Sequence, residues 1–265
     1  MATHLSCLGF EVTDRASLDS LLVRLASESD QLPCAEGVYL RWLSDAGPEM
    51  WLLYHREQGL VGFNPHFHGD SRVEAVKARA FERPNRTVLD GSLVVRTAEA
   101  GRTGAPQGAD LVIDMPDYRV GGRLVGDEPV GLQITAFAHS IRTWGSADAY
   151  LASDDTGARL GIGSFVATGL AGDRMLDSNP DPESQAVLVG TVEASERLSN
   201  PVGGDFFWAR VATDVGSFDV VTDPELLDQP IEPGAIIRGR FWLSGRVREY
   251  VEQRGQGLSV SVYRG

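Results

Sequence analysis

The sequence of 265 residues contains a single lysine, Lys77, and only two cysteines, Cys7 and Cys34. Two cysteines are too few for a zinc ribbon, and we expect both to be reduced thiols rather than a disulfide. Every other basic side chain that is permanently charged is an arginine, a bias typical of a GC-rich bacterial genome. Any lysine chemistry would therefore depend on Lys77 alone.

Long apolar runs and an excess of positive charge are also missing. No stretch approaches the roughly 20 apolar residues of a membrane-spanning helix. The opening residues, "MATHLSCLGFEVTD", lack the basic segment and long apolar stretch of a secretory signal. The formal net charge of -13 disfavours a nucleic-acid partner, because phosphates require a basic face. We therefore predict a cytoplasmic protein without a membrane partner.

The remaining composition is that of a folded protein, with 42% hydrophobic and 23% charged residues. The patterns predict an α+β fold that is mostly β. We expect a strand-rich α+β domain over residues 1–176 and a β-barrel domain over residues 186–265. Between them, residues 177–185 are acidic and carry two prolines, which is typical of a linker.

The first domain is expected to begin with a strand, "HLSCLGFEV", followed by a helix from Asp14 to about Ser27. Asp14 or Ser17 can cap this helix. Its apolar residues recur at helical spacing and are expected to face a sheet: Leu18, Leu21, Leu22 and Leu25. Three strands follow, "GVYLRWL", "MWLLYH" and "LVGFNPHF", joined by short turns. This βαβββ order over residues 3–68 resembles glyoxalase-like (vicinal oxygen chelate) folds and, in part, ferredoxin-like ones.

The middle of the chain is expected to consist of further strands that pack with the first module. The segments with strand composition are "RVEAVKARAFE", "RTVLDGSLVVRTA", "DLVIDM", "VGLQITAFAHSI", "DAYLA" and "LGIGSFVATGL". The last is not a hydrolase elbow, because Val166 stands where Gly-x-Ser-x-Gly requires its final glycine. It is not a dinucleotide-binding fingerprint either, so we interpret it as a glycine-bent strand.

Residues 186–265 resemble an OB-fold, a small five-stranded barrel. The predicted order is three strands, a short helix in "DPELLDQP", and two more strands, the last being "GLSVSVY". Asp223 can cap the helix and Pro224 suits its first position. Some OB-folds bind oligonucleotides through aromatic and basic side chains. A possible binding strip here comprises Trp208, Arg238, Arg240 and Trp242.

Several side chains raise the question of a metal site. His66 and His68 are two residues apart in a strand and would share one face, with Asp70 following and His55 at the end of the preceding strand. In glyoxalase-like modules a metal-binding histidine lies near the start of the first strand, as His4 does. We favour a plain strand end, with Phe63 and Phe67 facing the core and both histidines facing solvent or a shallow groove. No cofactor is expected beyond a loosely held divalent metal.

No motif for catalysis stands out. Asp114 and Asp117 in "DMPDY" flank a proline and are interpreted as a solvated turn. We therefore favour a non-enzymatic binding or regulatory protein whose partner is another protein or a small-molecule ligand, held by the barrel or by the groove between the domains. Two alternatives stay open: a metal-dependent enzyme centred on His55, His66 and His68, and single-strand nucleic-acid binding by the barrel.

Overall fold

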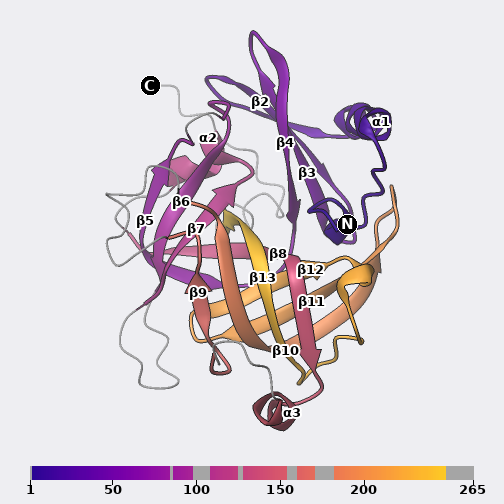
Figure 1. The fold of residues 1–265 in the computed structure, drawn as a ribbon. Helices are drawn as coiled ribbons and strands as arrows, with labels where there is room; N and C mark the ends of the chain where they lie inside the picture. Colours follow the sequence, from indigo (N-terminus) through magenta and orange to yellow (C-terminus); the bar gives the residue numbers. More distant parts are fainter. Residues whose placement is uncertain are drawn as a thin grey trace.

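Strands in two sheets make up most of the ordered structure in a computed structural model (Figure 1). The structure describes residues 2–83, 86–97, 108–124, 128–153, 160–170 and 182–248. Within these ranges, none of the helices has the length and apolar character needed to cross a membrane. The predominance of strands confirms the prediction of a mostly β, α+β protein.

The smaller sheet is antiparallel and has the order β1-β2-β3-β4. Its strands are β1 (Asp30–Pro33), β2 (Gly37–Leu43), β3 (Pro48–His55) and β4 (Gly59–Phe67). One face packs against helix α1 (Arg15–Ser27) through Trp42, Met50 and Leu52. The opposite face packs on the larger sheet through Tyr39, Trp51 and Leu53. Helix α1 and the larger sheet therefore pack on opposite faces of the smaller sheet.

Helix α1 forms where the sequence predicts it. The Asp14 carboxylate accepts a hydrogen bond from the Ser17 amide at 2.8 Å, and the Ser17 hydroxyl accepts one from the Asp14 amide at 3.0 Å. This reciprocal arrangement satisfies two backbone donors at the start of the helix. Leu22 and Leu25 are buried, and Leu18 and Leu21 are partly buried against the same cluster. The predicted apolar stripe is confirmed.

The segment before α1 differs from the prediction. Residues Ser6–Leu8 form a short 3₁₀ helix, η1, where a strand was expected. It ends at Gly9, whose positive φ of 72° is a left-handed conformation that breaks an extended chain. The strand β1, which was not expected, follows the helix instead. The predicted βαβββ order is therefore replaced by a 3₁₀ turn, a helix and four strands.

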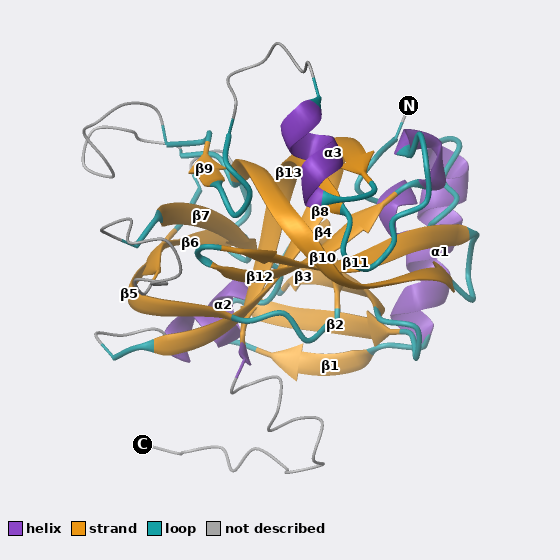
Figure 2. Ribbon diagram, turned by 90° about the horizontal axis from the view of Figure 1, so that it is seen from below, coloured by secondary structure: helices purple, strands orange, loops and turns teal. Residues whose placement is uncertain are grey.

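The larger sheet has nine strands in the order β11-β12-β8-β5-β6-β7-β13-β10-β9. Their bounds are β5 Val73–Phe81, β6 Gly91–Thr97, β7 Asp110–Met115, β8 Val130–Trp144, β9 Phe165–Ala167, β10 Gln185–Ser199, β11 Asp205–Thr213, β12 Gly216–Thr222 and β13 Ile236–Val247. The short helices are α2 Tyr118–Gly121, η2 Gly122–Leu124, α3 Ala147–Ala152 and η3 Pro224–Leu226. Figure 2 shows α1 and α3 outside the strands.

Two additional pairings close this sheet on itself. β10 also pairs with β11, and β8 also pairs with β13. One circuit of neighbouring strands therefore runs β10-β11-β12-β8-β13 and returns to β10. A second runs β8-β5-β6-β7-β13 and returns to β8. Strands β8 and β13 belong to both circuits.

The strands on either side of the predicted linker are thus hydrogen-bonded to each other. The division into residues 1–176, 177–185 and 186–265 stays a prediction, and most of the linker lies outside the described residues. The final strand predicted for residues 257–263 also lies outside them. In the first circuit, β8 stands beside β12 and β13, where the OB resemblance expected that final strand.

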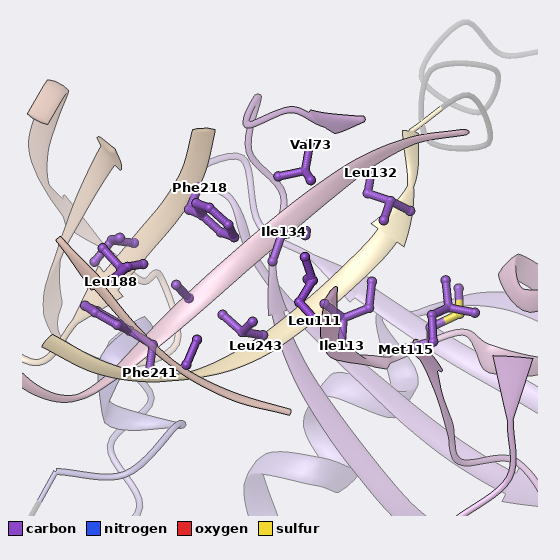
Figure 3. Close-up of a cluster of buried hydrophobic side chains, with 14 of the residues drawn as sticks. Val73, Leu111, Ile113, Met115, Leu132, Ile134, Leu188, Phe218, Phe241 and Leu243 are labelled. Atoms are coloured by element: carbon purple, nitrogen blue, oxygen red, sulfur yellow. The ribbon is translucent and has the colours of Figure 1, made fainter. Parts of the chain in front are cut away.

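The main core packs on the strands of the larger sheet, and Figure 3 shows part of it. Its labelled side chains come from β5, β7, β8, β10, β12 and β13: Val73, Leu111, Ile113, Met115, Leu132, Ile134, Leu188, Phe218, Phe241 and Leu243. All are almost completely buried. β8 and β13, which both contribute side chains to this core, also contribute to the site described below.

Two further predictions differ from the structure. "DAYLA" lies in the helix α3, because the Ser146 hydroxyl accepts a hydrogen bond from the Ala149 amide at 3.1 Å and caps a helical turn. In "LGIGSFVATGL", only Phe165–Ala167 is a strand. The short helix in "DPELLDQP" is confirmed as η3, with Asp223 as its cap and Pro224 in its first turn.

Candidate functional site

A pocket of about 550 Å³ opens between β4 of the smaller sheet and the middle of β8 and β13. Segments from seven parts of the chain line it, including the N-terminal residues, the end of β7 and the start of β10. Its charged and aromatic lining residues are His4, Phe63, Arg83, Arg86, Asp114, His139, Glu183 and Trp242. This convergence of polar groups on one hollow makes it the strongest candidate for a binding site.

Asp114, at the back of the pocket, is held by side chains from four different segments. Its Oδ1 accepts hydrogen bonds from Arg83 at 2.7 Å, Ser92 at 2.6 Å and Ser184 at 2.6 Å. Its Oδ2 accepts one from Trp242 Nε1 at 2.8 Å. Burial alone would raise the pKa of Asp114, but Arg83 and the three neutral donors outweigh it and lower that pKa. Asp114 is therefore an anion whose charge Arg83 neutralises.

Three flat side chains contact one another beside Asp114. The His4 ring lies on Trp242, with centroids 4.3 Å apart and planes 10° apart. At its Nε2 edge His4 meets His139: the centroids are 5.1 Å apart, the planes 8° apart and the two Nε2 atoms 2.8 Å apart, so these two rings lie edge to edge. The Trp242 ring is fixed in turn by its hydrogen bond to Asp114. The aromatic stack and the carboxylate thus form one connected group.

His139 reaches this position because of a β-bulge. Along the β8–β13 pair, Arg240 is opposite Ser140 and Phe241 is opposite Ala138, so His139 is an extra residue without a partner. A bulge redirects the side chain of the extra residue and is common next to functional sites. Both His139 and Ser140 are exposed, whereas the residues from Leu132 to Ala138 before them are all buried. The bulge turns His139 toward His4.

Both imidazoles of this pair are neutral at neutral pH. Burial and, to a smaller extent, the adjacent His139 lower the pKa of His4 to about 4, while Asp114 opposes the shift. Burial lowers the pKa of His139 as well, and the positive charge of Arg240 adds to the effect. Each neutral ring offers one nitrogen with a free lone pair and one N–H donor.

A second polar cluster lies between the two sheets and is buried. Glu49 Oε1 forms ion pairs with Arg41 and with Arg246 Nη1, the latter at 3.3 Å. Its Oε2 accepts a hydrogen bond from Trp51 Nε1 at 2.6 Å. Arg246 Nε also contacts Asp117 Oδ2 at 3.2 Å. Burial would raise the pKa of Glu49, but Arg246, Arg41 and other polar contacts outweigh it and lower that pKa to about 2.

His66 belongs to this buried region, which corrects the prediction that it faces solvent. It is completely buried, with Nδ1 2.9 Å from Ser244 Oγ and Nε2 2.7 Å from Gln133 Oε1. Burial lowers its pKa to about 3 against the attraction of Glu49. Phe67 does face the core as predicted, at 4% exposure. Both faces of β4 are covered at this end, so alternation could not indicate an open one.

The predicted metal-ligand set does not come together. In the β3–β4 pair, His55 is opposite Gly59 whereas His66 is opposite Glu49, at the other end of the strands. His68 Nδ1 lies 3.5 Å from Glu49 Oε1, and Asp70 Oδ2 lies 3.3 Å from Arg210. Across the described ranges, no group of three or more His, Cys, Asp or Glu side chains is arranged to hold a metal.

The predicted binding strip is divided in two. Arg238, Arg240 and Trp242 lie at alternate positions of β13, and Trp242 lines the pocket. Trp208 lies on β11, stacks on Phe67 with centroids 6.2 Å apart and donates to Asp219 at 2.9 Å. The paired aspartates are also not a solvated turn. Asp117 is completely buried and 16% of the Asp114 side chain is exposed, with each in a different cluster.

Sequence reasoning missed the partnership of His4 with His139 and the role of Arg83. Their separations in the chain are 135 residues for the histidine pair and 31 for Arg83 and Asp114, so no local pattern could relate them. Comparison with protein-family models, curated proteins and solved structures finds no match to this chain. The chemistry of the site must therefore be argued from its own geometry.

Proposed function

We propose that this protein is a non-catalytic binding protein that takes a small anionic ligand in the pocket beside Trp242. The observation that carries the proposal is the balance of charge there. Asp114 is already neutralised by Arg83, and Arg86 and Glu183 are both exposed at the lining with opposite charges. The charge of Arg240, which reaches His139 at the rim, therefore leaves a small positive excess. In a chain with a net charge of -13, such a local positive potential favours an anion.

The dimensions and walls of the pocket suit a small molecule. A volume of about 550 Å³ is within the range of ligand sites. Phe63 and the stacked Trp242 offer apolar surface, and the neutral His4 and His139 offer N–H donors and lone pairs. A carboxylate or phosphate near Arg86 with an apolar part against Phe63 would use each of these groups. Arginine is well suited to both kinds of oxyanion.

The circuit β10-β11-β12-β8-β13 supports the OB-like barrel as part of this proposal. Three strands, the short helix η3 and a fourth strand follow each other in the chain as the resemblance requires. We propose that β8 acts as the fifth strand, because it pairs with both β12 and β13. In this arrangement the pocket lies against the barrel wall, on the side of β8 and β13.

Single-strand nucleic-acid binding is the weaker alternative. It depends on aromatic faces that are free to stack on bases. The Trp242 ring is covered by His4, and the Trp208 ring lies against Phe67 with Arg210 above it at 5.7 Å. The metal-enzyme alternative is also weaker, because His55 is far from His66 along the strands. A small ligand requires neither free aromatic faces on these two rings nor the convergence of His55 with His66.

The test is binding by calorimetry and thermal shift with a panel of small carboxylates, phosphates and nucleotides, and with a short oligonucleotide. We expect a small anion to bind with one site per chain, and Arg86→Ala and Arg240→Ala each to weaken it about tenfold or more. Arg15→Ala, which removes the same charge from an exposed position on α1, is the matched control. Equal losses in all three variants, or binding of the oligonucleotide alone, would contradict the proposal.

A further inference from the structure

We propose that the ligand of this pocket is zwitterionic, with an ammonium group bound by Glu183, an acidic group bound by Arg86, and one further negative charge. A dipeptide of an acidic and an apolar residue, such as aspartyl-phenylalanine, is the reference case. The ligand is the small anion proposed above with its chemical class now named, so its assignment rests on that proposed function.

The first argument is that two opposite charges at the lining are not used by the protein itself. Arg86 and Glu183 are both exposed in the pocket. Neither forms an ion pair with any side chain in the described part of the chain, in contrast to Arg83, which is paired with Asp114 at 2.7 Å. A guanidinium and a carboxylate that are not paired internally can form charge-assisted hydrogen bonds with a ligand.

The second argument is that Arg83 ties together the segments that carry these two charges. Its Nη1 donates to the carbonyl oxygen of Pro182 at 3.0 Å, and its Nη2 donates to Ser184 Oγ at 2.9 Å. Glu183 lies between these two contacts, and Arg86 follows Arg83 in the connection from β5 to β6. Both charges therefore lie on the same side of the pocket, where one small molecule can reach them.

Asp90 is the acidic group that competes with a ligand for Arg86. Burial raises the pKa of Asp90, while its hydrogen bond from Asn64 Nδ2, at 2.9 Å, and the charge of Arg86 oppose that rise. Within the described ranges, no hydrogen bond or ion pair joins Asp90 to Arg86. The guanidinium of Arg86 thus retains its donors for an acidic group of the ligand.

The remaining lining indicates the net charge and the size of the ligand. The charges of Arg86 and Glu183 cancel, and Arg240 leaves a positive excess at the rim. A zwitterion with one additional acidic group complements that sum, whereas a simple dianion leaves Glu183 unmatched. Phe63 and Trp242 provide apolar walls, and the volume of about 550 Å³ is more than a single amino acid fills. A dipeptide with one acidic and one apolar side chain satisfies both requirements.

Calorimetry with two probes that differ only in the ammonium group tests this class of ligand. The probes are aspartyl-phenylalanine and succinyl-phenylalanine, in which a hydrogen atom replaces the amino group. We expect the full chain to bind the first about fivefold more tightly or better, which is the ratio that one solvent-accessible charge pair supplies. Arg86→Ala should weaken the binding of both probes alike, since both retain their acidic groups.

Glu183→Gln should remove the preference for aspartyl-phenylalanine and leave the binding of succinyl-phenylalanine unchanged or stronger. Glu57→Gln, which removes the same charge from the exposed turn after β3, is the matched control and should keep the preference. Equal binding of both probes by the parent chain, or a preference that survives in Glu183→Gln, would overturn the zwitterionic ligand. So would a loss of preference in Glu57→Gln, because the effect would then come from net charge alone.

The simple carboxylates and phosphates of the panel described above separate this result from the proposed function. If one of them binds and neither probe does, the zwitterionic class is wrong and the anion site stands. If no anion binds at all, the proposed function is wrong and the zwitterionic ligand is excluded with it.

Discussion

Glu49 and Arg246 form an ion pair across the two sheets, although 197 positions separate them in the chain. Glu49 is completely buried on β3, and 1% of the Arg246 side chain on β13 is exposed. The guanidinium also lies over the Trp51 ring at 4.6 Å. The charges of Arg41 and Asp117 extend the pair to a group of four alternating charges. This cluster links the smaller sheet to β13, one of the two strands that both circuits share.

Removing one member of the cluster should be costly. Glu49→Gln leaves Arg246 and Arg41 buried with less negative charge between them, so we expect the free energy of unfolding to fall by about 3–5 kcal/mol. Urea denaturation at neutral pH measures it. Glu57→Gln, in the exposed turn after β3, is the control. A loss below about 1 kcal/mol for Glu49→Gln would show that the pair is not important for joining the sheets.

Stability should fall as the solution becomes acidic, before Glu49 titrates. The pKa of His66 is about 3 in the folded chain, below the ordinary 6.5, so the unfolded state binds its proton first as the pH falls. Between pH 7.5 and 5.0 this single group should lower the free energy of unfolding by about 2 kcal/mol. His66→Gln should reduce that pH dependence in urea denaturation. An unchanged slope would mean that His66 is not held neutral.

The apolar face of α1 gives a third prediction. Leu22 is 6% exposed and packs in the cluster between the helix and the smaller sheet. Leu22→Ala should lower the free energy of unfolding by about 2–5 kcal/mol, because it removes buried methyl groups and leaves a cavity. Val23→Ala, at a position 73% exposed on the same helix, is the control. Similar thermal midpoints for the two variants would contradict the packing of the apolar face of α1 against the smaller sheet.

Gly69 gives a fourth prediction, because there is no space for a side chain. A Cβ atom there would lie 2.3 Å from the carboxylate of Asp219. That carboxylate is buried and accepts hydrogen bonds from the Ser71 amide, Gln133 and Trp208. Gly69→Ala should therefore cost about 1–3 kcal/mol by forcing the network apart. Chemical denaturation checks this, and a neutral effect would imply that the backbone can move away freely.

Local patterns predicted four elements near the start of the chain. β2 and the helix after Asp14 follow from the period of their apolar residues and, for the helix, from its cap. β3 and β4 were recognised as short apolar segments between turns, although β3 is buried on both faces. "DAYLA" was misread because a short helical turn with one buried residue, Tyr150, and a short strand look alike, and Ser146 was not recognised as a cap. Strand partners such as β8 and β13 depend on contacts far apart in sequence, which no periodicity contains.

The candidate site was harder to predict for a related reason. The charged residues Arg41, Glu49 and Arg246 are typical of a solvent-facing surface in sequence, but here they neutralise each other in the interior. His66 was assigned to solvent on the same assumption. His139 depends on one extra residue in β8, and whether a strand contains a bulge is decided by the partner strand. Only the three-dimensional pairing brings His139 to His4.

The place of β8 in both circuits has a consequence during synthesis of the chain. Of the strands that pair with β8, only β5 precedes it, whereas β12 and β13 follow it. In the β8–β13 pair, Leu132 is opposite Val247 and Trp144 is opposite Ile236. This long pairing can therefore form only after β13 has been synthesised. Until then β8 has an open hydrogen-bonding edge, which is a feature that promotes aggregation. A ribosome that stalls before Ile236 would release a chain in which neither circuit can close, so this sequence should depend on chaperones late in translation rather than early.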